Sequence, residues 1–394
     1  MGKALLIIVA GFSVIFSGVV FNLTSSQSRS AQEIVIQHEK WIARNAAESA
    51  ANVGIAKIYQ DIDWSAGLSG TFEGASYSIT ATNVTTDSVN EAKRIRVRVE
   101  TAFADETDST IVELVQPAYS YYNYFSREWP SWRTFQTGDT IPAPIHSNQS
   151  IRMQNSPVFM GKVSSNNSSF TTVVSASPKF YGGAEFGTST IFAPVLSGLK
   201  DSLAAYGDVH NQELWITFNA AGTFACSTAT IEHTNNVADY KGVKTINDGN
   251  HIHVSGTFTG QFTVLSEDNI YIDDDIQYVT DPRIDPTSTD LLGLVADNDI
   301  VINKNTNLEI HGALLTKEYI RVPFRSSLPI KTLTVLGSIG QRNGEEFGFP
   351  LLGLGYNLTH VYDDRLRDRT PPYFPRVFRS TDGLPRVEVL YRSK

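Results

Sequence analysis

The chain has 394 residues and a net charge of −9, and 41% of its residues are hydrophobic. This is enough material for a sizeable core, in one elongated domain or in two compact ones. Cys226 is the single cysteine, so an internal disulfide and a disulfide scaffold are excluded.

Residues 4–23 carry no charge. At about 1.5 Å per residue, a helix of this length crosses roughly 30 Å of hydrocarbon. The sequence therefore predicts a membrane anchor that faces lipid with apolar side chains, among them Leu5, Ile8, Phe12, Phe16 and Val20.

A signal peptide and a plain single-pass anchor are the ordinary alternatives. Lys3 provides the basic start of a signal peptide, but the apolar stretch is too long and no small-x-small cleavage site closes it. A single-pass anchor would leave Lys3 in the cytoplasm and would export the rest of the chain from the inner (cytoplasmic) membrane.

The helix is expected to continue to about residue 62, because the following segment has no proline and a single late glycine, Gly54. Its apolar positions form an alanine-rich stripe that would let another helix or a sheet approach closely. The stripe comprises Ile34, Val35, Trp41, Ile42, Ala46, Ala47, Ala50, Val53, Ile55, Ile58 and Ile62.

The segment NAAESAANVGIAKI at 45–58 resembles the stretch that follows the membrane helix in PilX-type minor pilins. The resemblance implies cleavage after a glycine, and cleavage after Gly2 would make Lys3 the methylated first residue. Cleavage after Gly11 would leave only about 18 Å of apolar helix. The glutamate that major pilins carry at the fifth mature position is replaced by Ile7 or Phe16, which suits a subunit at a filament tip or a protein that enters no filament.

Residues 63–118 are predicted to form a small antiparallel sheet on the helix. Segments 71–82, 93–103 and 109–116 alternate polar with apolar or β-branched residues. Within the second segment, Arg94, Arg96 and Arg98 share one face, which predicts a solvated side of the sheet.

Two blocks carry a more specific resemblance to large PilX-type, pilin-anchored proteins. The first, at 119–165, contains an aromatic cluster, the turn Thr137–Asp139 and the step His146–Asn148. The second contains GSIGQRNGEEFGF at 337–349 and GYNLTHVYDDRLRDRTPPYFP at 355–375. The resemblance implies a large extracellular β-domain between the pilin helix and the end of the chain.

The middle of the chain predicts a parallel β-solenoid. Short apolar alternations broken by Gly, Asn or Asp recur at 251–272, 291–303, 308–322 and 333–342. Inward positions would include Val254, Phe258, Phe262, Val264, Ile270 and Ile272. An antiparallel sandwich is the alternative, but two-residue Asn-Gly and Asp-Gly hairpin signals are scarce.

The expected fold class is α+β, mainly β, with six parts. They are the membrane and pilin-like helix at 1–62, the small sheet at 63–118, the first part of the solenoid at 119–192, an insertion with a short helix at 193–245, the second part of the solenoid at 246–350, and an extended basic segment at 351–394.

No catalytic constellation is recognisable, and we expect no cofactor and no metal. Eight aspartates between Asp273 and Asp299 could supply paired carboxylates or a calcium site, but a solvated acidic edge explains them better. His251 and His253 could join His233 or His311 around a metal, although isolated surface histidines are commoner. Cys226 has no nearby histidine or aspartate motif.

The end of the chain is basic: from Arg365 onward, eight Arg and Lys face three acids. Its arginines could bind an anionic polymer such as DNA or an acidic glycan, or could pair with the acidic edge of the solenoid. The candidate ligand-binding residues are Arg365, Arg367, Arg369, Arg376 and Arg379.

We therefore expect a non-enzymatic minor pilin-like protein of a type IV pilus-like system, at the filament tip or in assembly priming, with a head that binds a surface, glycan or DNA. Its partners would be the membrane, other pilin subunits and the assembly machinery. A static envelope protein that never enters a filament, and a polysaccharide-active enzyme built on the solenoid, are the alternatives.

Overall fold

The computed structural model describes residues 2–131, 133–230, 232–247, 249–323, 326, 329–344, 347–349, 352–379 and 386–393. The chain divides into two units. The first unit comprises Met1–Val84, Ile95–Leu114 and Val389–Lys394, and the second comprises Thr85–Arg94 and Val115–Glu388.

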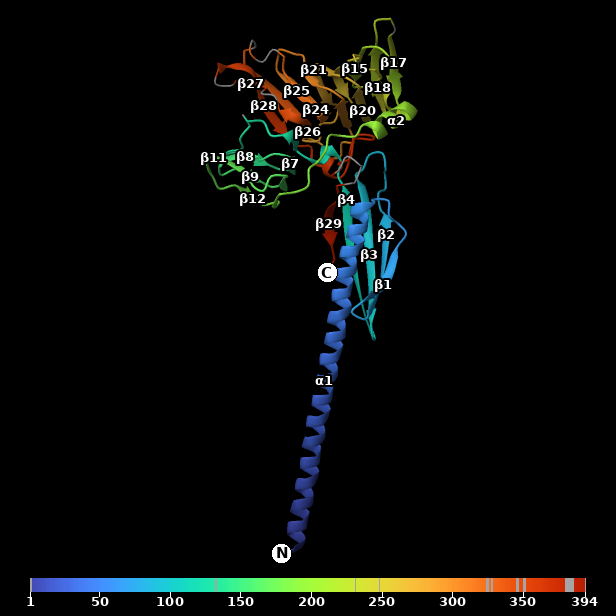
Figure 1. The fold of residues 1–394 in the computed structure, drawn as a ribbon, viewed down its shortest axis with the longest axis vertical. Helices are drawn as coiled ribbons and strands as arrows, with labels where there is room; N and C mark the ends of the chain where they lie inside the picture. Colours follow the sequence, from blue (N-terminus) through green and yellow to red (C-terminus); the bar gives the residue numbers. More distant parts are fainter. Residues whose placement is uncertain are drawn as a thin grey trace. The chain divides into compact units, whose positions relative to one another are not determined.

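The first unit begins with one continuous helix, α1 (Gly2–Gln60), of 59 residues (Figure 1). It ends where the amide of Asp61 still donates to the carbonyl of Lys57, and the Asp61 side chain then accepts the amide of Asp63. The predicted long helix is confirmed, and its end lies two residues before the expected one.

A five-stranded sheet with the order β1-β2-β3-β4-β29 accompanies the helix. Its strands are β1 (Leu68–Phe72), β2 (Ala75–Asn83), β3 (Lys93–Phe103), β4 (Glu106–Gln116) and β29 (Glu388–Arg392). The predicted strand at 71–82 is divided by a hairpin turn, because Glu73 and Gly74 both adopt positive φ angles of 49° and 85°. The first three strands pair antiparallel, as predicted.

The sheet has one dry and one wet face. Along β3, Ile95, Val97 and Val99 are buried, whereas Arg96 and Arg98 are exposed. Arg96 pairs with Glu113 at 2.6 Å across to β4. The predicted solvated face is confirmed for Arg96 and Arg98, and Arg98 pairs with Glu100 of the same strand. Arg94 is partly buried and pairs with Asp368, which lies outside the sheet.

Small residues of α1 pack on the dry face. The buried positions recur at three- and four-residue intervals, which places them on one side of the helix. They are Ala43, Ala46, Ala47, Ala50, Ala51, Gly54 and Ile58. At Gly54, an added Cβ would lie 2.7 Å from Cγ1 of Val97, so the helix and β3 approach too closely for a side chain there.

The second unit is built mainly from parallel strands, many of which pair with the next strand but one along the chain. Ile252 pairs with Ile270, Ile270 with Ile300 and Ile300 with Ile320, so isoleucines stack in register across four strands. These strands are β19 (Ile252–Phe258), β21 (Ile270–Tyr278), β23 (Ile300–Ile302) and β25 (Tyr319–Arg321).

Other strands of the second unit form a neighbouring parallel set. It includes β18 (Gly242–Thr245), β20 (Gln261–Ser266), β22 (Leu291–Ala296), β24 (Leu308–Thr316), β26 (Lys331–Gly344) and β28 (Leu354–Val361). The six residues predicted to point inward, from Val254 to Ile272, are all at most 1% exposed. The predicted inward face is therefore confirmed.

The first sequence block pairs with the second. Strand β5 (Tyr124–Glu128) lies parallel to β26 and to β7 (Ile145–Ser147), which continues into β10 (Val163–Ser165) and β13 (Ala184–Phe186). Between β26 and β5, the side-chain amide of Gln341 donates to the Tyr124 hydroxyl at 3.0 Å. The hydrogen-bonded strand network of the second unit closes on itself.

Short strands complete this first part of the second unit. In two small parallel groups, β6 (Thr140–Ile141) and β12 (Lys179–Phe180) flank β9 (Val158–Phe159), and β8 (Arg152–Asn155) pairs with β11 (Thr171–Ala176).

Residues 193–245 contain the predicted short helix, α2 (Ser197–Tyr206), but also strands of the parallel set. β14 (Asp208–His210) pairs with β18, and β15 (Leu214–Asn219) pairs with β19. Strands β16 (Thr223–Ser227) and β17 (Glu232–Asn236) extend β15 as antiparallel neighbours. Among the described strands of this unit, the other antiparallel pair is β28 with β27 (Gly348–Phe349).

The whole chain is thus mainly β, with a long N-terminal helix and a small antiparallel sheet.

Candidate functional site

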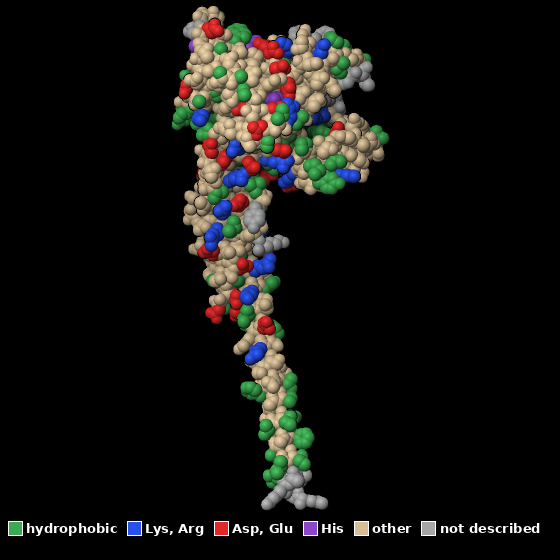
Figure 2. Space-filling model, turned by 180° about the vertical axis from the view of Figure 1, so that it is seen from behind, with side chains coloured by type: hydrophobic (Ala, Val, Ile, Leu, Met, Phe, Trp, Pro, Cys, Tyr) green, Lys and Arg blue, Asp and Glu red, His purple; other side chains and the backbone are tan. Residues whose placement is uncertain are grey.

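The first candidate is the apolar part of α1. The helix from Leu6 onward is long and apolar enough to cross a membrane, and the apolar window is 0% buried. Phe12 and Phe16 are each 71% exposed, and Ile8 and Val20 are also exposed. Figure 2 shows hydrophobic side chains along this end of the helix. The side chains of Leu5, Gly2 and Lys3 lie outside those described, so the predicted processing position stays a prediction.

Hydroxyl side chains in the apolar segment and directly after it bond to the helix itself. The hydroxyl of Ser13 donates to the carbonyl of Val9, and that of Thr24 to the carbonyl of Val20, both at 2.9 Å. These bonds satisfy groups that would otherwise be costly in hydrocarbon.

Large apolar side chains stay exposed on α1 beyond the uncharged segment. Ile34 is 70% exposed, Val35 54% and Trp41 58%. The predicted apolar stripe therefore divides into a buried and an exposed part. Ile34, Val35 and Trp41 are exposed, whereas the stripe residues that the sheet buries are Ala46, Ala47, Ala50 and Ile58. Within the first unit, these three large apolar side chains are left uncovered by the sheet.

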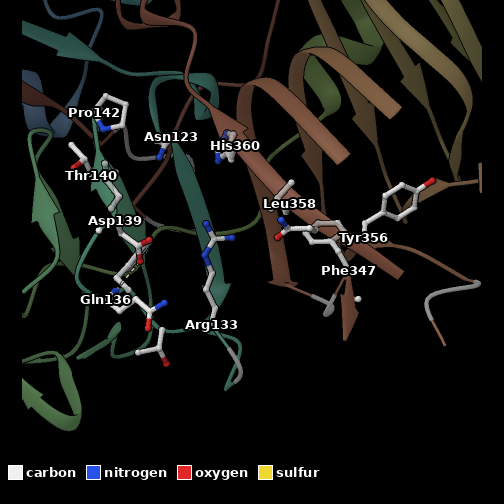
Figure 3. Close-up of a pocket in the computed structure, with 16 residues that line it drawn as sticks. Asn123, Arg133, Gln136, Asp139, Thr140, Pro142, Phe347, Tyr356, Leu358 and His360 are labelled. Atoms are coloured by element: carbon white, nitrogen blue, oxygen red, sulfur yellow. Dashed lines mark hydrogen bonds between the residues drawn. The ribbon is translucent and has the colours of Figure 1, made fainter. Parts of the chain in front are cut away.

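The second candidate is an open pocket of about 630 Å³ in the second unit. Residues of both sequence blocks line it, including Arg133, Gln136 and Asp139 from the first block and Phe347, Tyr356 and His360 from the second. Arg133 lies between the two groups (Figure 3). The pairing of β5 with β26 brings the two blocks together, although they lie about two hundred residues apart in sequence.

The pocket is polar and close to neutral. The guanidinium of Arg133 lies 4.0 Å from the centre of the Tyr124 ring, a cation–π contact that fixes its position. Asp139 supplies the opposite charge, and its carboxylate accepts a hydrogen bond from the backbone amide of Gln136 at 2.8 Å. Burial lowers the pKa of His360 to about 3, so His360 adds no positive charge at neutral pH. The pocket offers hydrogen bonds and aromatic surface without a concentration of cations.

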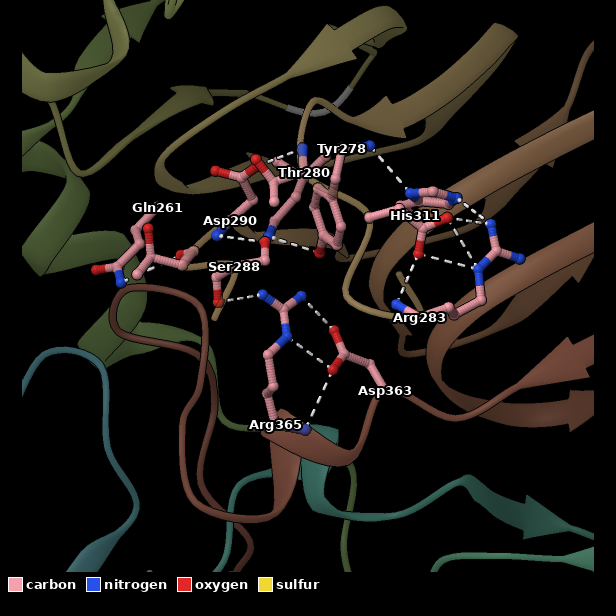
Figure 4. A network of polar contacts seen from close by, with 12 residues as sticks. Gln261, Tyr278, Thr280, Arg283, Ser288, Asp290, His311, Asp363 and Arg365 are labelled. Atoms are coloured by element: carbon pink, nitrogen blue, oxygen red, sulfur yellow. Dashed lines mark hydrogen bonds and ion pairs between the residues drawn. The ribbon is translucent and has the colours of Figure 1, made fainter. Parts of the chain in front are cut away.

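The predicted ligand-binding arginine Arg365 is engaged inside the second unit. Its Nη2 lies 2.6 Å from Oδ2 of Asp363, and its Nη1 donates to the Ser288 carbonyl at 2.8 Å (Figure 4). The guanidinium also lies 5.5 Å from the centre of the Tyr278 ring. The side chains of Arg365 and Asp363 are only 13% and 2% exposed, so this pair has the character of a structural contact.

The four remaining arginines have separate surroundings. Arg367 donates to the Pro142 carbonyl and pairs with Asp364, and Arg376 donates to the carbonyls of Ser88 and Glu91. Arg369 is exposed and Arg379 is partly buried. Their role in binding an anionic polymer stays a prediction.

The aspartates between 273 and 299 are mostly paired. Asp274 lies 2.7 Å from Lys304, Asp281 lies 2.6 Å from Arg283, and Asp299 lies 2.7 Å from Arg321. Asp290 is buried and accepts the backbone amide of Gly260 at 2.8 Å. Arg283 also contacts Glu309 beside His311 (Figure 4). These contacts are typical of an acidic edge that stabilises the fold. Among the described residues, these aspartates do not form a general acid and a general base on either side of a substrate position.

The histidines predicted as alternative metal ligands are separated. His251 pairs with Asp268 at 3.2 Å, and His253 pairs with Asp273 at 2.7 Å between the stacked rings of Trp215 and Tyr271. His233 instead lies beside Asp208, His210 and Cys226. Sequence reasoning missed this group, because its members come from three strands with no regular ligand spacing.

Comparison with known proteins finds no matching family model and no matching curated protein. The PilX resemblance is therefore not confirmed by a family match. Among solved structures, the chain is similar to the competence-associated pilin ComZ from Thermus thermophilus, with a TM-score of 0.37 and 10% sequence identity over 90% of this chain and 97% of that chain. This TM-score is too low to assign a function, so we base the function on the residues of this chain.

Proposed function

We propose that this chain is a membrane-anchored, non-enzymatic pilin-like protein of a type IV pilus-like system. Its second unit is a β-solenoid head, presented outside the cell for ligand binding. The six sequence-defined parts, from the helix at 1–62 to the basic segment at 351–394, describe this organisation. The protein resides in the cytoplasmic membrane before assembly and at the pilus tip after it, with pilin subunits and the assembly machinery as partners.

The observation that carries the proposal is that two parts of α1 differ in the surroundings of their side chains. Its first part exposes apolar side chains without charge, and its later part buries a seam of alanines against an antiparallel sheet. Exposed Ile34, Val35 and Trp41 continue the apolar surface past the segment that would lie in lipid. A plain anchor needs only the uncharged apolar part. A helix that packs among neighbouring helices also needs exposed apolar side chains beyond the lipid, such as Ile34, Val35 and Trp41.

Placement at the tip or in priming follows from charge. Neither Ile7 nor Phe16 can neutralise the amino terminus of a neighbouring subunit as a carboxylate would, and an uncompensated charge in hydrocarbon is costly. A subunit with no such neighbour does not need the carboxylate.

For the head we favour a glycan as ligand over DNA. The pocket beside Arg133 balances that cation with Asp139 and adds aromatic and amide groups, which suits a neutral polyhydroxyl ligand. DNA binding needs a surplus of free cations. Arg365, whose side chain is only 13% exposed, is already neutralised by Asp363.

The deciding experiment for the filament role is amino-terminal mass spectrometry on protein from sheared surface filaments and, separately, from membranes. A peptide that begins at methylated Lys3 in the filament fraction supports the proposal. An intact amino terminus found only in membranes contradicts it and leaves the static envelope protein. Immunogold labelling regularly along filaments would contradict the tip placement.

The ligand is tested by glycan-array binding of the purified full chain, compared with Arg133→Ala and with Arg369→Ala as an exposed control. Loss of glycan binding in Arg133→Ala alone supports the pocket. Salt-sensitive DNA binding that Arg369→Ala weakens and Arg133→Ala does not would favour the basic segment instead. Release of product from a glycan would favour the enzyme alternative.

A further inference from the structure

Four potential metal ligands meet in the second unit, away from the pocket. They are Asp208 and His210 of β14, Cys226 of β16 and His233 of β17, and one ligand atom from each lies within 4.8 Å of all the others. Cys226 is fully buried, and the other three are partly buried.

The strand pattern accounts for this convergence. Asp208 and His210 are two residues apart on β14, so their side chains leave the strand on the same side. Cys226 and His233 are direct partners in the antiparallel pair of β16 and β17, which also places their side chains on one face. Two strand faces, each carrying two ligands, thus face one another.

The contacts around Asp208 are unusually crowded. Three nitrogen atoms approach its Oδ2: Nε2 of His210 at 3.0 Å, Nε2 of His233 at 3.2 Å and Nδ2 of Asn235 at 3.0 Å. Nε2 of His210 is buried and, despite this short distance, lacks the geometry of a hydrogen bond. A buried polar nitrogen without a hydrogen bond is costly, and a cation between these atoms would satisfy it.

The donor set is one thiol sulfur, two imidazole nitrogens and one carboxylate oxygen. Zinc favours this mixture in tetrahedral geometry, with bonds of about 2.0–2.3 Å. Ligand atoms in such a tetrahedron lie roughly 3.3–3.8 Å apart. The imidazole nitrogens of His210 and His233 lie 3.0 and 3.2 Å from Oδ2 of Asp208, slightly closer than this range, and the four ligand atoms all lie within 4.8 Å of one another. Side-chain adjustments, some inward and some outward, would give the tetrahedral separations.

We propose that Asp208, His210, Cys226 and His233 bind one Zn²⁺ ion in a closed, structural site. Four protein ligands leave no position for a substrate, so the ion fastens the β16–β17 pair to β14 rather than catalysing a reaction. This site is independent of the pilin-like function and of the glycan pocket.

The thiol must lose its proton when the metal binds. Coordination replaces that proton by the metal, and metal uptake therefore releases about one proton per chain.

The test uses the purified full-length protein in detergent, stripped with a chelator and titrated with Co²⁺ and then Zn²⁺. Co²⁺ reports tetrahedral geometry through its visible bands and a bound thiolate through a near-ultraviolet charge-transfer band. We expect one metal per chain, displacement of Co²⁺ by Zn²⁺, and loss of the charge-transfer band in Cys226→Ser.

His233→Ala is the second variant, because His233 lies at a partly exposed position where the change should preserve folding. It should weaken Zn²⁺ binding at least tenfold and abolish the rise in melting temperature that Zn²⁺ gives the wild-type protein. His251→Ala is the matched control, since it removes a histidine that is paired with a different aspartate of the same unit. A wild-type protein that takes up no more metal than His233→Ala, or equal loss in His251→Ala, would overturn the proposal.

Discussion

At the scale of single residues, the second unit holds several charged or polar side chains in water-excluded positions, each with a defined partner. Asp363 and Arg365 form a bidentate pair, and His146 lies between Ser164 and Asn148. His146 belongs to the His146–Asn148 step of the first sequence block. Both sets of contacts fix the fold of the second unit.

Arg365→Ala should destabilise the second unit by about 3–5 kcal/mol, because it leaves the Asp363 carboxylate buried without its partner. Denaturant unfolding of the full-length protein measures this change. Arg367→Ala, at a 47% exposed side chain, is the matched control and should cost less than about 1 kcal/mol. Equal stability of the two variants would show that the Arg365 pair is not structural.

His146 should make the second unit sensitive to acid. Burial lowers the pKa of this histidine to about 3, whereas its ordinary value is 6.5, so the folded state holds it neutral. The stability that it contributes is complete above pH 6.5 and is lost as the pH falls toward 3, at up to about 1.4 kcal/mol per pH unit.

The measurement is the melting temperature between pH 7 and pH 4. His146→Gln should lower stability at pH 7 but flatten the decline with acid, while the exposed His38→Gln should leave the profile unchanged. An unaltered acid slope in His146→Gln would assign the sensitivity to other groups.

At the scale of elements, α1 and its sheet are matched through small residues. Ala43 also accepts a hydrogen bond through its carbonyl from the buried hydroxyl of Thr101, at 2.9 Å. Because alanine and glycine leave the helix surface nearly flat, β2 and β3 can approach it closely.

Gly54→Ala should destabilise the first unit by about 1–3 kcal/mol, since its Cβ would lie 2.7 Å from Cγ1 of Val97 and 3.1 Å from Cγ2 of Ile79. Gly18→Ala in the same helix meets no atom within 4 Å and should be neutral or stabilising. The melting temperatures of the two variants in detergent distinguish an effect of packing from an effect of helix propensity. A stabilised Gly54→Ala variant would argue against the close approach of α1 to β2 and β3.

At the scale of the whole molecule, the proposed function assigns different tasks to two stretches of one helix. Phe12 would lie in lipid, while Trp41 would meet a neighbouring pilin helix beyond it. Both are more than half exposed.

Phe12→Lys should reduce membrane retention, because a charge near the middle of a membrane helix costs about 2.5–3.5 kcal/mol. Trp41→Ala should keep the protein in the membrane fraction but lower its recovery in sheared filaments. Immunoblots of the two fractions measure both effects. Unchanged filament recovery in Trp41→Ala would remove the support that its exposure gives to subunit contact.

The sequence by itself determined the long helix, the wet arginine face of β3, α2 and the inward side chains from Val254 to Ile272. These features depend on local periodicity and propensity, which neighbouring residues encode. The tight turn at Glu73–Gly74 was missed because a glycine within an alternating pattern does not by itself distinguish a strand from two strands joined by a turn.

Only the tertiary structure decided which distant residues meet. It placed Arg365 against Asp363 and Ser288, joined both sequence blocks around the pocket, and brought Cys226 to His233, His210 and Asp208. Such contacts depend on how strands from separate parts of the chain pair in register, and no spacing within the sequence specifies that register.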